Sequence, residues 1–294
     1  MKSFATYKSD VVQTKRTSME HLQKLKPLEF IELIKSFKQA GGKISNVEVR
    51  VKVDGLGARF GKDKSGKFFF ESSRSGPIFD SGSFKKFTLA KTDNIISLER
   101  ADHYDTLFEI LKTSSFVKAM PADTKVMCEI LYNPMAQIEE DGITFVSIKY
   151  DKAKLGTTMT IVPYSVLDSQ GTQHPDSVSI IDALLKASTS EIKIMSNRVN
   201  DADIDITGHL QILDVLDAES LRVLKSLKRD DQPLKKLVLD LIQTAKEKIA
   251  DYILNHPTIL DKDKFGKEIE GLVLGFPDRT LKVTTPVFKA SKAK

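Results

Sequence analysis

The sequence predicts an α+β fold in which strand-rich segments enclose a mainly helical one. Three observations support this fold class. Apolar and polar residues alternate over 47–53, which is the period of a half-buried strand. Between about 176 and 256 apolar residues recur at three- and four-residue intervals, which is the period of a helix. Strand patterns return after Asp261, over 269–274 and 281–287.

These changes of period also predict how the chain is divided. We expect an N-terminal helical segment over 1–44, a core formed by 45–170 together with 262–294, and a mainly helical insert over 171–261. A chain of 294 residues is long enough for one or two domains with a substantial buried core.

Local signals place the elements of the first half. Apolar residues at helical spacing predict a helix over 27–40, which Gly41-Gly42 ends. The turn sequence Asp63-Lys64-Ser65-Gly66 predicts a hairpin with arms near 56–61 and 67–72. The periods that follow predict a helix near 102–119 and strands near 124–131, 143–149 and 158–167.

Composition bounds the class of protein. Apolar residues make up 40% of the chain and charged residues 29%, and no apolar run approaches the ~20 residues that a bilayer crossing requires, so we expect no membrane partner. The first thirty residues are polar and basic, which favours a cytoplasmic location, the host cytoplasm if a phage encodes the chain. The single Cys128 excludes an internal disulfide. A net charge of +5 suits an anionic partner such as nucleic acid, and equally a lysine-rich surface that serves solubility.

Two short segments near the first predicted strand carry candidate chemistry. Lys52-Val53-Asp54-Gly55 closes the strand, although the same tetrad also fits a surface strand that ends in an Asp-Gly turn. Because a strand-end lysine contributes little to a core, we expect Lys52→Ala to leave the chain folded. Arg74, in Ser73-Arg74-Ser75-Gly76, follows the predicted hairpin. An arginine there either forks onto phosphate oxygens or is a solvated loop residue.

Four further residues stand in or beside apolar strands. Glu129 and Glu270 are carboxylates next to apolar runs, so each either faces solvent or performs a specific task. Tyr164 lies near the middle of a predicted strand and is either a core aromatic or a stacking platform for a base. Lys282 has apolar neighbours, and alternation points it at solvent unless it binds an anion, because a buried lysine without an anionic partner is rare.

In this order the segments resemble the motifs of the covalent nucleotidyltransferases, the superfamily of ATP-dependent DNA ligases, RNA ligases and mRNA capping enzymes. Lys52-Val53-Asp54-Gly55 looks like motif I, and Arg74, Glu129, Tyr164, Glu270-Gly271 and Lys282 look like motifs Ia, III, IIIa, IV and V. The similarity covers roughly 45–168 and 267–289. A last motif with one clear lysine followed by a phenylalanine, here Phe288, is similar to phage-type ligases.

The resemblance implies a fold and a reaction. The fold would be two antiparallel sheets that form a nucleotide-binding cleft, an ATP-grasp-like core with a helical insertion. Lys52 would attack the α-phosphate of ATP and carry AMP through a phosphoramidate bond. The AMP would pass to a 5′-phosphate of RNA or DNA at a nick or broken end, and a 3′-hydroxyl would displace it to seal the strand.

The resemblance also implies roles for the remaining residues. Glu129 would bind the ribose hydroxyls and Tyr164 would stack on the adenine. Lys282 and Arg74 would stabilise charge on the phosphates. Glu270, with Asp54, would place a divalent metal, Mg²⁺ or Mn²⁺, and Asp54 would also orient the lysine.

Two departures from the family pattern leave alternatives open. Many relatives carry an OB-fold domain after motif V, whereas twelve residues follow Lys282, which favours the RNA-ligase branch or an unusual phage enzyme. Thr284 stands where motif V commonly has a second lysine. The alternatives are a nucleotide-binding pseudoenzyme or interaction module with a ligase-like fold, and a capping-type guanylyltransferase, which would form a GMP adduct instead.

Overall fold

The computed structural model divides the chain into two compact units. Unit 1 comprises 1–52, 198–263 and 269–294, and unit 2 comprises 53–197 and 264–268. The structure describes residues 19–285 except for 40, 44–46, 73–74, 141, 146–147, 200–203, 217, 226–232, 258, 260–263, 267 and 277–278.

Unit 1 is built on a four-stranded sheet with the order β1-β12-β11-β2. The central strands β11 (Gly271–Gly275) and β12 (Thr280–Thr284) are antiparallel to each other, and β11 is antiparallel to β2 (Glu48–Lys52). The two-residue strand β1 (Glu20–His21) adds to β12 in parallel. Strands from both ends of the chain therefore meet in one sheet, as the return of strand patterns after Asp261 predicted.

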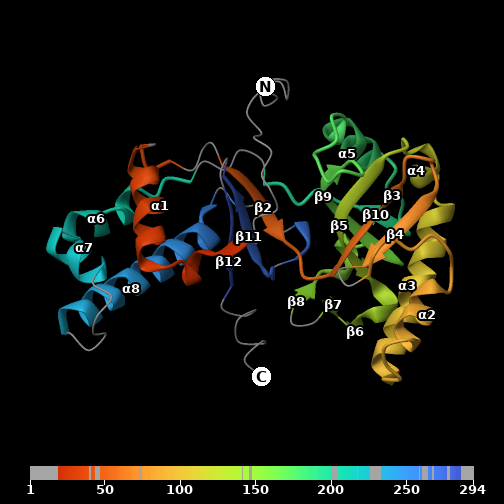
Figure 1. The fold of residues 1–294 in the computed structure, drawn as a ribbon, viewed down its shortest axis with the longest axis horizontal. Coiled ribbons are helices and arrows are strands. Elements are labelled where there is room, and N and C mark those ends of the chain that lie inside the picture. The colour runs from red at the N-terminus through yellow and green to blue at the C-terminus, as the bar shows by residue number, and fades with distance from the viewer. Residues whose placement is uncertain are drawn as a thin grey trace. The chain divides into compact units, whose positions relative to one another are not determined.

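Apolar residues on alternate strand positions form the buried face of this sheet. Val51, Leu272 and Val283 are fully buried there. Two long helices belong to the same unit, α1 (Pro27–Gln39) and α8 (Pro233–Asn255), and α8 packs on β12 (Figure 1). The shorter helices of unit 1 are η2 (Leu22–Lys24), η5 (Thr207–His209), α6 (Ile212–Val215) and α7 (Ala218–Lys225).

The sequence signals for α1 are confirmed. Proline is favoured in the first helical turn because its missing N–H needs no partner there, and α1 begins at Pro27. Gly41 and Gly42 follow with φ of 73° and 76°, a left-handed conformation that favours glycine. The Gly42 N–H donates to the Phe37 carbonyl at 2.8 Å, which ends the helix.

Unit 2 is built on a five-stranded sheet with the order β10-β9-β5-β3-β4. The hairpin of β3 (Leu56–Lys62) and β4 (Phe68–Ser72) is confirmed. Its turn is held by Asp63, whose carboxylate accepts hydrogen bonds from Ser65 N and Lys67 N at 2.9 Å each. The other strands are β5 (Thr124–Tyr132), β9 (Met159–Leu167) and β10 (Ile192–Ile194).

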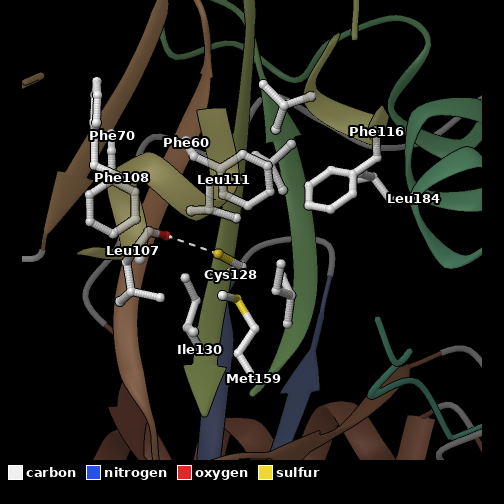
Figure 2. Packing of buried hydrophobic residues seen from close by; sticks show 14 of the residues in the cluster. Phe60, Phe70, Leu107, Phe108, Leu111, Phe116, Cys128, Ile130, Met159 and Leu184 are labelled. Carbon is white, nitrogen blue, oxygen red and sulfur yellow. Dashed lines mark hydrogen bonds between the residues drawn. The ribbon is translucent and has the colours of Figure 1, made fainter. Parts of the chain in front are cut away.

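Helices cover the apolar face of the five-stranded sheet. Buried residues of α3 (Ile95–Thr113), α4 (Ser115–Ala119) and α5 (Ser177–Lys186) form one cluster with residues of β3, β4, β5 and β9. Figure 2 shows Leu107 and Leu111 in this cluster beside Cys128, whose thiol donates to the Ala58 carbonyl at 3.6 Å. Because Cys128 is fully buried, desolvation raises the pKa of its thiol well above the usual value.

Smaller elements complete unit 2. A three-stranded sheet contains β6 (Gln137–Glu139), β7 (Gly142–Phe145) and β8 (Ile148–Tyr150), and α2 (Ser83–Leu89) packs on α3. The 3-10 helices are η3 (Asn133–Met135) and η4 (Lys152–Lys154). In the part of the chain that the structure describes, no helix has the length and apolar character that crossing a bilayer requires.

The α+β class is confirmed, with corrections in detail. The expectation of purely antiparallel sheets is wrong at the edges, because the short strands β1 and β10 each join a large sheet in parallel. The strand expected over 143–149 is two strands, β7 and β8. The helix expected at 102–119 begins earlier, where Asn94 caps α3, and a break at Ser114 separates α3 from α4. The expected domain bounds stay a prediction.

Candidate active site

Lys52 is the last residue of β2 and forms an ion pair with Glu270. Its Nζ donates to Glu270 Oε2 at 2.5 Å, and the two residues are 218 positions apart in the chain. The pairing follows from the sheet, because Lys52 lies opposite Gly271 in the β2–β11 ladder and Glu270 directly precedes Gly271. The side chains are 18% and 5% exposed, so this is a largely buried ion pair.

The face of the four-stranded sheet that carries Lys52, here called the Lys52 face, holds several basic side chains and also Glu48, which pairs with Arg50 at 3.9 Å. In a strand every second residue points to the same face, so Arg50 shares this face with Lys52. In the register Val273 lies opposite both Arg50 and Lys282, which places Lys282 on the Lys52 face as well. His21 on β1 lies opposite Lys282. Four basic side chains thus belong to one face of unit 1.

Position 284, the second basic position of the resemblance, is a buried threonine that is 2% exposed. Thr284 lies opposite Gly271 and therefore in the same row as Lys52. Next to it, the Thr285 hydroxyl donates to the Ile269 carbonyl at 3.1 Å and the Thr285 N–H donates to the Glu270 carbonyl at 3.0 Å. The end of β12 therefore fixes the backbone that carries Glu270.

In unit 2, a tyrosine that sequence reasoning missed holds Asp54. The Tyr150 hydroxyl accepts from the Asp54 N–H at 2.7 Å and donates toward the Asp54 carbonyl at 3.3 Å. Tyr150 is 1% exposed, so water does not compete for these bonds. Both backbone groups of Asp54 are thereby fixed two residues after Lys52. The sequence held no signal for this role, because a tyrosine in an apolar strand is typical of a core residue.

Glu129 lies near the middle of β5, half-buried and opposite Gly57 and Val162. Because strand residues alternate, it shares one face of the five-stranded sheet with Lys125 and Arg59; we call this the Glu129 face. Gly57 contributes no side chain beside Glu129.

Tyr164 is the extra residue of a β-bulge. Met127 lies opposite Ser165, whereas Cys128 lies opposite Pro163, so one residue is inserted in β9. Proline has no N–H to donate to a ladder, which explains why the register breaks at this point. Bulges re-aim side chains and are frequent beside active sites. Tyr164 is half-buried.

A buried ion cluster occupies the Glu129 face farther along the sheet. Glu71 is 6% exposed, and its carboxylate forms ion pairs with Arg59 Nη1 at 3.2 Å and with Lys125 Nζ at 3.5 Å. Sequence reasoning did not single out these residues. The signal was present in the alternation, because Glu71 follows the run Phe68-Phe69-Phe70 inside a predicted strand.

The predicted site residues thus fall into two groups that the structure describes. Lys52 and Lys282 share a face in unit 1, where Lys52 pairs with Glu270, and Glu129, Tyr164 and Asp54 belong to unit 2. Arg74 and Phe288 lie outside the described residues. Within the described residues no group of three or more His, Cys, Asp or Glu side chains is placed to hold a metal ion. Glu270 and Asp54 do offer the carboxylate oxygens that magnesium prefers.

No protein-family model and no curated protein matches this chain. Its function is therefore inferred from its motifs and from the geometry of the two sheet faces.

Proposed function

We propose that the chain is an ATP-dependent polynucleotide ligase that works through a lysyl-AMP intermediate on Lys52. The observation that carries this proposal is the buried ion pair between Lys52 and Glu270. Buried lysines and carboxylates are rare unless they are paired, and burying this pair at a strand end costs desolvation energy. A stable fold does not need such a pair at that position, whereas a lysine nucleophile needs a neighbouring acceptor.

The first step is nucleophilic attack by Lys52 Nζ on the α-phosphorus of ATP. A nitrogen–phosphorus bond forms, the bond between the α-phosphorus and its bridging oxygen breaks, and pyrophosphate leaves with the electron pair. As the ammonium partner of an ion pair, Lys52 must lose two protons: the first passes to Glu270, which already accepts its hydrogen bond at 2.5 Å, and the second leaves to solvent as the nitrogen–phosphorus bond forms. Lys282 and Arg50, on the same face, supply positive charge toward the phosphates.

The residues of unit 2 complete the proposal. Glu129 binds the ribose, Tyr164 stacks on the adenine, and Asp54 is held by Tyr150 so that the backbone after the nucleophile is fixed. Arg74 belongs to the proposal through the resemblance alone. The nucleotide-binding cleft expected from the two sheets is part of the same proposal.

Magnesium is the proposed metal, because Glu270 and Asp54 provide carboxylate oxygens and the nucleotide provides phosphate oxygens. When bound, the ion would neutralise charge on the phosphates. AMP then moves to a 5′-phosphate of RNA or DNA, where a phosphoanhydride forms as the bond to Lys52 breaks. A 3′-hydroxyl attacks that 5′-phosphate, and AMP leaves as the strand is sealed.

The test is adduct formation with α-³²P-labelled ATP or GTP and magnesium, followed by a denaturing gel and peptide mapping. We expect a label from ATP on Lys52 in the wild type and none in Lys52→Ala. The matched control is Lys149→Ala, because Lys149 also pairs with a carboxylate, Glu139, at 2.9 Å. It should label normally.

Other results would redirect the assignment. A label from GTP instead of ATP would indicate a capping-type guanylyltransferase. Folded wild-type protein that takes no label from either nucleotide would refute the ligase and favour a nucleotide-binding module. A normal adduct in folded Lys52→Ala would remove Lys52 from the nucleophile's role.

A further inference from the structure

A cavity of about 170 Å³ opens on unit 2. Its lining includes Phe69 of β4, Lys125 of β5 and Phe79, which follows the β4 edge. In the register Gly61 lies opposite both Phe69 and Lys125. Phe69 and Lys125 therefore flank Gly61 on the Glu129 face, and Glu71 lines the same cavity.

The cavity is separate from the proposed nucleotide position. Lys125 and Glu129 are four residues apart on β5 and point to the same face. At about 3.3 Å per residue their Cα atoms are about 13 Å apart. A ligand that reaches both positions must therefore extend over about 13 Å, which a nucleic acid strand of two or more nucleotides does.

Two aromatic rings form one wall. The centroids of Phe69 and Phe79 are 6.3 Å apart with an interplanar angle of 57°. Phe69 is buried, whereas Phe79 is half-buried and reaches the opening. Lys67 Nζ lies 5.1 Å from the centroid of Phe79, and Lys125 Nζ lies 5.7 Å from that of Phe69. Such a wall of aromatic faces with lysines alongside is the composition of sites where bases stack.

Polar groups at the cavity are balanced in charge. Glu71 lies beneath, with Arg59 and Lys125 as its partners. At the rim, the Asp123 carboxylate accepts from Ser169 N at 2.9 Å, and hydrogen bonding by Ser169 holds the pKa of Asp123 below its usual value. The carboxylates disfavour an anionic phosphate in the cavity. They favour a neutral, planar group that forms hydrogen bonds.

The rim is also fixed in shape. Asp123 adopts φ of 57°, a left-handed conformation that is unfavourable for most residues with a side chain. Its N–H donates to the Asp63 carbonyl at 3.0 Å, which ties the β3–β4 turn to the start of β5. Backbone in such unfavourable conformations persists only where the surrounding contacts hold it, and it is frequent at ligand sites.

We propose that this cavity is a subsite for one unpaired nucleobase of the nucleic acid strand. The base would stack on Phe79, with its polar edge toward the Glu71 cluster. This inference rests on the proposed ligase function for its choice of ligand. The cavity and its lining do not depend on that function.

The test compares two phenylalanines of the same chemistry. Phe79→Ala removes one of the two rings of the wall. Phe87→Ala on α2 is the matched control, because Phe87 is 38% exposed and also has a lysine, Lys91, at 4.0 Å from its ring centroid. The probes are a fluorescein-labelled ten-nucleotide single strand and the same strand with abasic sites, measured by anisotropy at low salt. Phe79→Leu serves as a second variant that keeps apolar volume without the aromatic face.

We expect Phe79→Ala to weaken binding of the normal strand by about 5- to 100-fold, the range for the loss of one base–aromatic stack. Phe79→Leu should show most of this loss, and Phe87→Ala less than a twofold change. On the abasic strand all variants should bind within about twofold of the wild type. Adduct formation with ATP should be unchanged in Phe79→Ala.

Three results would overturn the inference. One is wild-type protein that does not bind the single strand. Another is Phe79→Ala that binds it as tightly as the wild type, and the third is an equal loss on normal and abasic strands. A wild type that forms no adduct with ATP would refute the ligase proposal alone, since the binding comparison does not depend on adenylation.

Discussion

Replacing Lys52 tests whether the buried ion pair is a structural unit as well as a chemical one. Lys52→Met keeps a long unbranched side chain and removes the charge, which leaves the Glu270 carboxylate, 5% exposed, without its lysine. Removing one partner of a buried pair typically costs about 3–5 kcal/mol. Because the Lys52 side chain is 18% exposed and solvent reaches it, we expect about 3 kcal/mol.

The size of this effect is measurable by thermal unfolding followed by circular dichroism. For a folding unit of roughly 150 residues, 1 kcal/mol corresponds to about 2–4 °C in Tm, so Lys52→Met should lower Tm by about 6–12 °C. The double variant Lys52→Met with Glu270→Gln removes both charges and should recover to within about 1 kcal/mol of the wild type.

Lys149→Met is the matched control for the melts. The side chains of Lys149 and its partner Glu139 are 35% and 44% exposed, and pairs of this kind contribute at most about 1 kcal/mol. Its Tm should fall by less than about 4 °C. The reasoning would be refuted by a Lys52→Met protein that melts with the wild type, or by a double variant that is as unstable as the single one.

Three further predictions follow from contacts in unit 2. Tyr150→Phe removes the hydroxyl that accepts from Asp54 N at 2.7 Å, so the variant should lose about 1–2 kcal/mol of stability. It should also form the adduct more slowly in single-turnover labelling. The control Tyr132→Phe should change that rate less than twofold. Gly61→Ala would set a methyl group against the Thr124 carbonyl oxygen and push β3 from β5. It should therefore destabilise the protein by about 3 kcal/mol or more in urea titrations. An unfolding midpoint equal to that of the wild type would contradict the observed strand spacing. Burial raises the pKa of the Cys128 thiol well above its usual value, so the thiol stays protonated at pH 8.5. It should react with a disulfide reagent only after the protein is denatured. Rapid labelling of the native protein would show that the cluster in Figure 2 opens readily.

Elements defined by local signals could be predicted from the sequence. Pro27 and Gly41-Gly42 bracket α1, and Asp63 with Gly66 sets the β3–β4 turn, because each signal acts within a few residues. The bulge at Tyr164 was also within reach, since Pro163 in a central strand cannot donate to the ladder.

Features that depend on distant pairing could not be predicted in the same way. The motif order placed Lys52 and Glu270 in one predicted site, but their direct contact depends on the register of β2 with β11. The hold of Tyr150 on Asp54 likewise joins segments that are 96 residues apart. A helix such as α2, seven residues long, has too few turns for its period to stand out.

The pairing of β2 with β11 also has a consequence for synthesis on the ribosome. Chains emerge at about 5–20 residues per second, so β2 waits roughly ten seconds or more for its partner strand. Residues 53–197 of unit 2 are made during that interval, whereas the edge of β2 that pairs with β11 stays open. Its N–H and C=O groups can then pair with other chains. Lys52 therefore meets Glu270 only after residue 270 has been made. A nascent or truncated chain that lacks β11 would expose Lys52 without its partner, so the ion pair can form only in chains that extend beyond residue 270.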